Sequence, residues 1–238
     1  MKRPYIICHI LSALDGKITG ASFGTPQAQV ISREYARIRG EYHADAWLYG
    51  TTTTKEFTGF RKPELTENES LIPEGDFLAQ TDADLYYISV DTEGEIGWES
   101  GIFRKAGRPD AHVIEVLIEK TPMAYRAYLR RKGVSYIIAG KDTLDCQLAA
   151  QKLYELFGIE MMLICGGGII NWTFLQQDMV DELSLLLAPV TDGSPDTVSV
   201  FERAAFLPER EPVSFRLKAA EPLKNDGIRL LYTVDRSE

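Results

Sequence analysis

The stretch MMLICGGGIINWTFL, residues 161–175, indicates the fold class of this chain. Met161–Cys165 has the composition of a buried strand, three glycines follow, and helical spacing runs from about Ile169 to Gln177. Three consecutive glycines remove every Cβ from the turn, and a helix N-terminus offers free N–H groups to a phosphate. The turn therefore suits a pyrophosphate, and a closely packed strand-to-helix connection is the alternative interpretation.

Strands and helices alternate on both sides of this turn. Apolar runs predict strands at 5–11, 46–49, 85–90, 113–118, 134–139 and 183–190. Helical spacing predicts helices at 32–42, with Ser32 as the N-cap, at 121–132, ended by Gly133, and at 144–157, ended by Gly158. This order is typical of an α/β fold in which a mainly parallel sheet is covered on both faces.

The C-terminal region has a different pattern. The alternating runs Ser214–Leu223 and Ile228–Val234 flank the turn sequence KNDG, which predicts an antiparallel hairpin that completes a mixed sheet. Lys55–Gln80 lacks a clear period and is expected to be a long surface loop or lid, and Gly94–Asp110 is expected to be irregular. Because no repeat or linker interrupts the chain, we expect one domain over residues 1–238.

The composition excludes several classes of protein. The chain has 238 residues, 45% of them hydrophobic, and its net charge of −9 argues against binding along a nucleic-acid backbone. No apolar run approaches the roughly 20 residues that a membrane-spanning helix needs. The three cysteines, Cys8, Cys146 and Cys165, are widely spaced, which fits reduced, buried thiols in a cytoplasmic protein.

Two further loops follow predicted strands and carry polar side chains. Gly50–Thr54 combines a turning glycine with four threonines, which suit phosphate or ribose oxygens or simply cap a helix. Asp15-Gly16-Lys17 can hold a polar substrate or form a common turn. Open α/β sheets bind ligands at the carboxyl ends of their strands, so the joint occurrence of two glycine turns there favours a ligand.

Other chemistries find less support in the sequence. The glycine triplet follows neither the G-x-G-x-x-G nor the P-loop pattern. His9, His43 and His112 are isolated from other metal ligands, so no metal site is expected. Without a G-x-S-x-G motif, catalysis would depend on a bound cofactor for its difficult step.

The combination of these motifs resembles the reductase domain of riboflavin biosynthesis, the RibD C-terminal domain, within the wider dihydrofolate-reductase-like group. The resemblance is carried in order by Leu14–Ile18, Ala44–Ala46 with Gly50 and Thr53, Gly166–Gly168, Val180–Leu183, and Ala188–Val190 with Gly193. It extends over nearly the whole chain. It implies a three-layer α/β/α fold with a mixed, mostly parallel sheet, a homodimer, and NADPH lying across the strand ends.

The resemblance also implies roles for individual residues. In such enzymes the Gly-x-x-Thr turn and the glycine-rich loop contact the dinucleotide, so the candidate cofactor contacts here are Gly50, Thr51, Thr53, Gly166, Gly167, Gly168 and Ile169. Asp15 and Lys17 match the segment that lines the substrate pocket. We expect Asp15 to orient the substrate or aid proton delivery, and Lys17 to hold a phosphate or carbonyl oxygen.

Three departures from the family pattern fall on the substrate side. Ala13 replaces a serine, Glu56-Phe57-Thr58 replaces Asp-Asp-Pro, and Gly166 stands where glutamate is often found. The resemblance implies NADPH-dependent reduction of 5-amino-6-(5-phosphoribosylamino)uracil at the ribosyl C1′. A reductase of a pterin or another heterocycle and a non-catalytic NADPH-binding protein are the alternatives. Lys141, Arg104 or another basic residue would bind the 2′-phosphate of NADPH.

Overall fold

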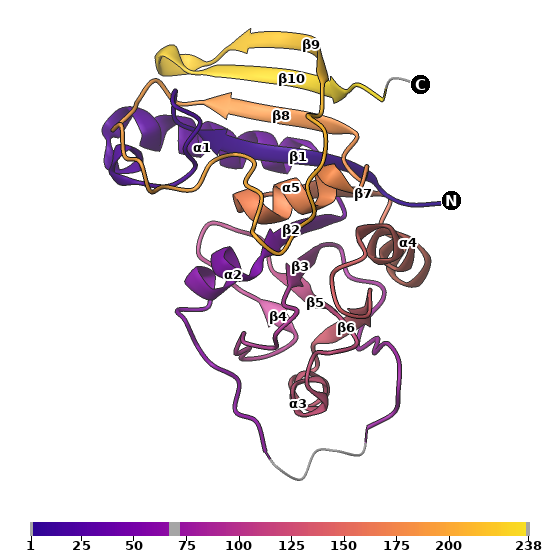
Figure 1. Cartoon of the computed structure of the whole chain (residues 1–238). Helices are drawn as coiled ribbons and strands as arrows, with labels where there is room; N and C mark the ends of the chain where they lie inside the picture. Colours follow the sequence, from indigo (N-terminus) through magenta and orange to yellow (C-terminus); the bar gives the residue numbers. More distant parts are fainter. Residues whose placement is uncertain (1, 67–71, 237–238) are drawn as a thin grey trace. The chain divides into compact units, whose positions relative to one another are not determined.

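The computed structural model describes residues 2–66 and 72–236, and its chain forms two compact units (Figure 1). Unit 1 consists of residues 1–4 and 45–162, and unit 2 consists of residues 5–44 and 163–238. Both units contain strands and helices, so the α/β class is confirmed. The expected single domain over 1–238 stays a prediction.

The sheet of unit 1 is parallel except for one short strand. Its parallel strands are β2 (Ala46–Gly50), β3 (Tyr86–Val90), β5 (Ala111–Leu117) and β6 (Ser135–Ile138), and the antiparallel strand is β4 (Ile102–Phe103). Strands β2, β3 and β5 are almost entirely buried, and Leu48, Ile88 and Ile114 lie side by side in the register. Their apolar sequences fit this position because strands covered on both faces have no polar, solvent-facing side.

Three helices follow strands of unit 1. They are α2 (Thr51–Phe57), α3 (Met123–Lys132) and α4 (Cys146–Phe157). Gly133 and Gly158 both have a φ of 67° and end α3 and α4 in the left-handed conformation, which confirms the two predicted helix ends. At the other end of α4, Asp145 Oδ1 accepts a 2.8 Å hydrogen bond from the Leu148 amide and acts as the N-cap.

The sheet of unit 2 contains the antiparallel C-terminal strands. Strand β1 (Tyr5–Ser12) pairs in parallel with β8 (Glu182–Leu187), β8 pairs antiparallel with β10 (Ile228–Val234), and β10 pairs antiparallel with β9 (Phe215–Pro222). The predicted hairpin is therefore confirmed, and Figure 1 shows its two yellow strands side by side. The strand β7 (Met161–Ile164) leads the chain from unit 1 into unit 2.

The first long helix, α1 (Pro26–Glu41), starts six residues before the predicted start at Ser32. That prediction was wrong because the start is set by Thr25, whose Oγ1 accepts a hydrogen bond from the Ala28 amide, and by Pro26, which has φ preset for a first helical position. Ser32 lies inside the helix and donates to the Ala28 carbonyl at 2.9 Å. The core between α1 and β8 is formed by Ala28, Ile31, Ile38, Leu186 and Ala188.

Two segments that were expected to be irregular contain regular structure. Helix α2 includes Lys55–Phe57, so the predicted loop at 55–80 is wrong at its start, and Phe77 forms an isolated bridge with Tyr136. Residues 67–71 of that stretch lie outside the described residues. Within 94–110, β4 forms because Phe103 packs in a buried aromatic cluster with Tyr87 and Trp98.

The described residues contain no helix that is long and apolar enough to cross a membrane. The three cysteines are free and buried, as the sequence predicted.

Candidate active site

The Asp15 side chain lies in the loop that follows β1 in unit 2. Asp15 is exposed, and its Oδ2 accepts a 2.7 Å hydrogen bond from Thr191 Oγ1. This bond lowers the pKa of the Asp15 carboxyl, and the backbone N–H of Lys17, 3.4 Å from Oδ1, acts in the same direction. Lys17 itself is half-buried, and its Nζ donates to the Thr197 carbonyl at 3.1 Å. The loop thus carries a carboxylate that is bound to Thr191 and, two residues later, an ammonium group that is bound to the Thr197 carbonyl.

The glycine turn follows β7 and leads into α5 (Gly168–Gln176). Gly166 has a φ of 103°, which side chains rarely adopt, and a Cβ there would lie 3.2 Å from Ile10 Cδ1. The peptide bond between Gly166 and Gly167 is cis. A Cβ on Gly168 would lie 2.2 Å from the Ser199 carbonyl oxygen, so close packing within the chain requires glycine at 168. The packing interpretation therefore holds at Gly168.

The N-terminus of α5 has the properties of an anion site. Gly167 is the N-cap and has no side chain to satisfy the first N–H groups of the helix, and the first turn contains no acidic residue. The Ile169 side chain in this turn is 41% exposed. Free amide donors and the helix dipole favour a phosphate here, and an exposed apolar side chain can cover the less polar part of a ligand. These residues fit the pyrophosphate of a dinucleotide.

The Gly50–Thr54 turn belongs to unit 1, where it forms the start of α2. Gly50 is the N-cap, and the Thr51 hydroxyl donates to the Val90 carbonyl at 2.6 Å, tying α2 to the end of β3. The Thr54 hydroxyl is buried and lies 3.0 Å from the Tyr87 hydroxyl. Thr53 is half-buried, and its hydroxyl has no hydrogen-bond partner among residues 2–66 and 72–236. Among the threonines of this turn, Thr52 and Thr53 thus have hydroxyls with no hydrogen-bond partner in the described part of the chain.

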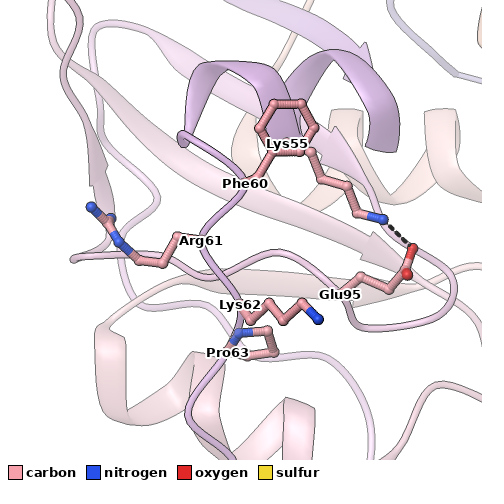
Figure 2. A pocket seen from close by; sticks show the side chains of 6 residues that line it. All are labelled: Lys55, Phe60, Arg61, Lys62, Pro63 and Glu95. Carbon is pink, nitrogen blue, oxygen red and sulfur yellow. Dashed lines mark hydrogen bonds and ion pairs between the residues drawn. The ribbon is translucent and has the colours of Figure 1, made fainter.

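A small basic pocket lies beside the end of α2 (Figure 2). Its cavity of about 300 Å³ is lined by Lys55, Phe60, Arg61, Lys62, Pro63 and Glu95. Lys55 Nζ is 2.6 Å from Glu95 Oε2, and Figure 2 shows the Arg61 guanidinium pointing away from this pair. Arg61 instead pairs with Glu99. Lys62 forms no ion pair within the described part of the chain. Because Lys55 and Arg61 are each paired with a glutamate, Lys62 is the cation of this pocket that could attract an anion.

This pocket was missed by the sequence analysis because its residues fall in the stretch predicted as a surface loop. The signal that could have found it is the pair Arg61-Lys62 soon after Lys55. The predicted site residues are divided between the units. Asp15, Lys17, the glycine triplet and Ile169 lie in unit 2, whereas Gly50, Thr51 and Thr53 lie in unit 1.

Comparison with known proteins identifies a family to which the chain belongs and relatives with named functions. Residues 4–228 match a family model described as the RibD C-terminal domain. A protein of Methanothermobacter thermautotrophicus named 2,5-diamino-6-ribosylamino-4(3H)-pyrimidinone 5′-phosphate reductase is 26% identical over 234 residues, covering 98% of this chain and 99% of that protein. A protein of the same name from Aquifex aeolicus is 24% identical, covering 92% of each chain.

Solved structures show that the fold is shared. A pyrimidine reductase-like protein of Corynebacterium diphtheriae superimposes with a TM-score of 0.68 at 16% identity and covers 98% of this chain and 93% of that one. RibD of Acinetobacter baumannii gives a TM-score of 0.65 at 20% identity and covers 98% of this chain and 58% of that one.

Proposed function

The chain belongs to the RibD C-terminal domain family, and on this premise we propose that it is an oxidoreductase that reduces a ribosylaminopyrimidine 5′-phosphate in riboflavin biosynthesis. Three curated relatives are named as reductases of the 2,5-diamino-pyrimidinone form of this compound. The uracil form implied by the sequence resemblance differs from it by a 2-oxo group in place of the 2-amino group. We take the diamino form as the substrate, and the uracil form is the comparison compound.

The observation that carries the proposal is the uncapped N-terminus of α5 behind the glycine turn, whose first turn lacks acidic side chains. Such a terminus suits the pyrophosphate of a nicotinamide dinucleotide. When bound, this cofactor would supply the hydride that converts the ribosyl C1′ to the ribityl form. NADPH is the form we propose, with Gly166, Gly167, Gly168 and Ile169 as contacts in unit 2. Gly50, Thr51 and Thr53 of unit 1 are candidate contacts on the sequence resemblance alone.

Two side chains are proposed to act on the substrate. Asp15, held as a carboxylate by Thr191, accepts a hydrogen bond from the ribosylamino group and so orients it. The role in proton delivery expected from the sequence would need the protonated carboxyl, which the bond from Thr191 disfavours. Lys17, whose ammonium is positioned by the Thr197 carbonyl, binds a phosphate or carbonyl oxygen of the substrate. The reaction then depends on positioning and on charge stabilisation by these groups, with no covalent enzyme intermediate.

The first experiment is a titration of the protein with NADPH and then NADH, followed by tryptophan fluorescence and by calorimetry. Trp172 lies in α5 and should report binding at the glycine turn. Binding that favours NADPH supports the proposal. If neither nucleotide binds by either method, the glycine turn is a packing feature and the reductase proposal fails.

The second experiment measures turnover of the diamino and uracil substrates by wild-type protein and by Asp15→Asn. The substitution removes the charge of Asp15 and should lower kcat by about 100-fold, since misplacement of a reacting group can cost that much. Asp142→Asn, which breaks the exposed ion pair with Lys120, is the matched control and should retain full activity. Full turnover by Asp15→Asn would exclude the role of Asp15.

We also propose that the protein is a homodimer. In unit 2, β9 lies at the edge of the sheet, Leu217 on this strand is 59% exposed, and Ile228 on the neighbouring strand β10 is 38% exposed. An edge strand with exposed apolar side chains is suited to pairing with a second copy. Sedimentation should give a dimer for the wild type and a monomer for Leu217→Lys. A monomeric wild type would contradict this proposal.

A further inference from the structure

Residues 197–202 of unit 2 bond to the loop that carries Asp15 and Lys17. The Ile18 amide donates to the Val198 carbonyl at 2.9 Å, and the Val200 amide donates to the Gly16 carbonyl at 3.1 Å. Between these bonds, Lys17 and Ser199 form an antiparallel bridge. The Lys17 side chain adds a bond to the Thr197 carbonyl. The loop is thus held like a strand against residues 197–200.

The same residues 197–202 bond to the start of α5. The Glu202 amide donates to the Gly168 carbonyl at 3.1 Å. Asn171 Nδ2 donates to the Val200 carbonyl at 2.8 Å. Gly168 allows this approach, because a Cβ there would lie 2.2 Å from the Ser199 carbonyl oxygen and 3.1 Å from Val198 Cγ1. The 197–202 segment therefore contacts both the candidate catalytic loop and the candidate cofactor turn.

Asn171 is the side chain through which α5 holds this segment. It is 0% exposed, and its Oδ1 has no partner among the described residues, so its one bonded polar atom is the Nδ2 that reaches Val200. Val200 in turn binds Gly16 through its amide. The amide and the carbonyl of Val200 thus link Asn171 to the residue next to Asp15.

We propose that Asn171 is a positioning residue for the reduction. By holding the Val200 carbonyl it fixes the 197–202 segment, and this segment sets the position of Asp15 and Lys17 relative to the N-terminus of α5. The kinetic part of this inference rests on the proposed function. The structural part concerns the chain alone and can be tested without cofactor or substrate.

The structural part is tested by hydrogen exchange of the unliganded protein. Asn171→Ala should speed exchange of the Ile18, Val200 and Glu202 amides by about tenfold or more, since loss of one contact opens a locally cooperative unit. Ser184→Ala is the matched control, because it removes a buried hydrogen-bonding hydroxyl of β8 that contacts His9 and Arg229. It should leave these three amides unchanged. Faster exchange confined to α5 would overturn the proposal, as would equal effects in both variants.

A second variant covers the case in which Asn171→Ala does not fold. Gly168→Ala places a methyl group against the Ser199 carbonyl and should displace the same segment away from α5. It should give the same pattern of faster exchange at Ile18 and Val200. Unchanged exchange at both amides would show that the segment does not link the turn to the loop, and would overturn the proposal.

The kinetic part is tested by measuring the effects of the substitution on kcat and on KM separately. Asn171→Ala should lower kcat by about tenfold or more, because misplacement of reacting groups is costly, while the KM for NADPH stays within about twofold. An unchanged kcat would overturn the positioning role. If the wild type turns over neither pyrimidine, the proposed function fails, and the exchange experiment still decides whether Asn171 couples the two loops.

Discussion

The Trp98 indole Nε1 donates a 2.6 Å hydrogen bond to Glu115 Oε1 in the interior of unit 1. Both residues are buried, and Glu115 Oε2 has no partner in the described part of the chain. Burial raises the pKa of the Glu115 carboxyl well above its ordinary value, and the nearby Asp91 carboxyl raises it further. Asp91 is itself buried and accepts hydrogen bonds from the amides of Gly94, Glu95 and Ile96.

Glu115 should therefore make the protein less stable as the pH rises. The folded protein keeps Glu115 protonated, whereas the unfolded chain releases this proton above the ordinary pKa of 4.5. Glu115→Gln keeps the Oε1 acceptor for Trp98 but cannot ionise. Above pH 4.5 the unfolding free energy of this variant should fall less steeply than that of the wild type, and the two slopes should differ by up to about 1.4 kcal/mol per pH unit. Urea unfolding between pH 5 and 9 measures the two slopes, and parallel slopes would contradict the prediction.

His9 of β1 should have the opposite effect, a loss of stability as the pH falls. It is buried, its ring stacks on Tyr35 at 4.4 Å, and its Nε2 lies 3.1 Å from the Tyr35 carbonyl. Because a carbonyl only accepts, Nε2 carries the proton and Nδ1 accepts from the Ser184 hydroxyl. Burial lowers the pKa of His9 to about 3 from its ordinary 6.5. The stability due to neutral His9 is present above pH 6.5 and is lost as the pH falls toward 3.

The test compares His9→Phe with the wild type. Phenylalanine keeps an aromatic ring beside Tyr35 but binds no proton. Between pH 6.5 and 4, the unfolding free energy of the wild type should therefore fall more steeply than that of the variant, by about 1.4 kcal/mol per pH unit. The variant should start about 1–3 kcal/mol less stable at pH 7, since the Ser184 hydroxyl and the Tyr35 carbonyl each lose a hydrogen bond to the imidazole ring. His43→Asn changes an exposed histidine and is the control. A wild-type slope in His9→Phe would exclude His9 as the source.

The bond between Thr54 and Tyr87 should contribute to the stability of unit 1. The two hydroxyls lie 3.0 Å apart and both residues are 0% exposed. Thr54→Val should cost about 1–3 kcal/mol, because it leaves the Tyr87 hydroxyl buried without a partner. Adding Tyr87→Phe removes that hydroxyl, so the double variant should lose less than the sum of the single variants. Denaturant unfolding measures all four proteins, and strict additivity would contradict this coupling.

Local signals in the sequence predicted most of the fold. The ends of α3 and α4 could be predicted because Gly133 and Gly158 adopt a left-handed conformation that other residues avoid. The start of α1 was misplaced because Ser32 is also a favoured N-cap residue, whereas Thr25 followed by Pro26 is the stronger signal. The two-residue strand β4 gives no pattern of its own and depends on packing of Phe103 in the aromatic cluster.

The candidate site was predicted less completely because its contacts join distant residues. Asp15 and the glycine triplet could be found from short motifs. The partner of Asp15, Thr191, is 176 residues away, and no local rule relates the two. The bond from Asn171 to Val200 joins residues 29 positions apart, with strand β8 between them, and no local pattern in the sequence relates the two. The fold brings these residues together, so the positioning of the loop appears only in the structure.

Thr191 should control the ionisation of Asp15 during turnover. Its hydroxyl is the main cause of the lowered pKa of Asp15, so Thr191→Val should raise that pKa toward the ordinary 3.8. If Asp15 acts as a carboxylate, the acid limb of the kcat/KM profile should move to higher pH in this variant. Thr233→Val, on β10 of the same unit, should keep the wild-type profile. If the acid limb does not move in Thr191→Val, the limb belongs to a group other than Asp15. If it disappears in Asp15→Asn, it belongs to Asp15.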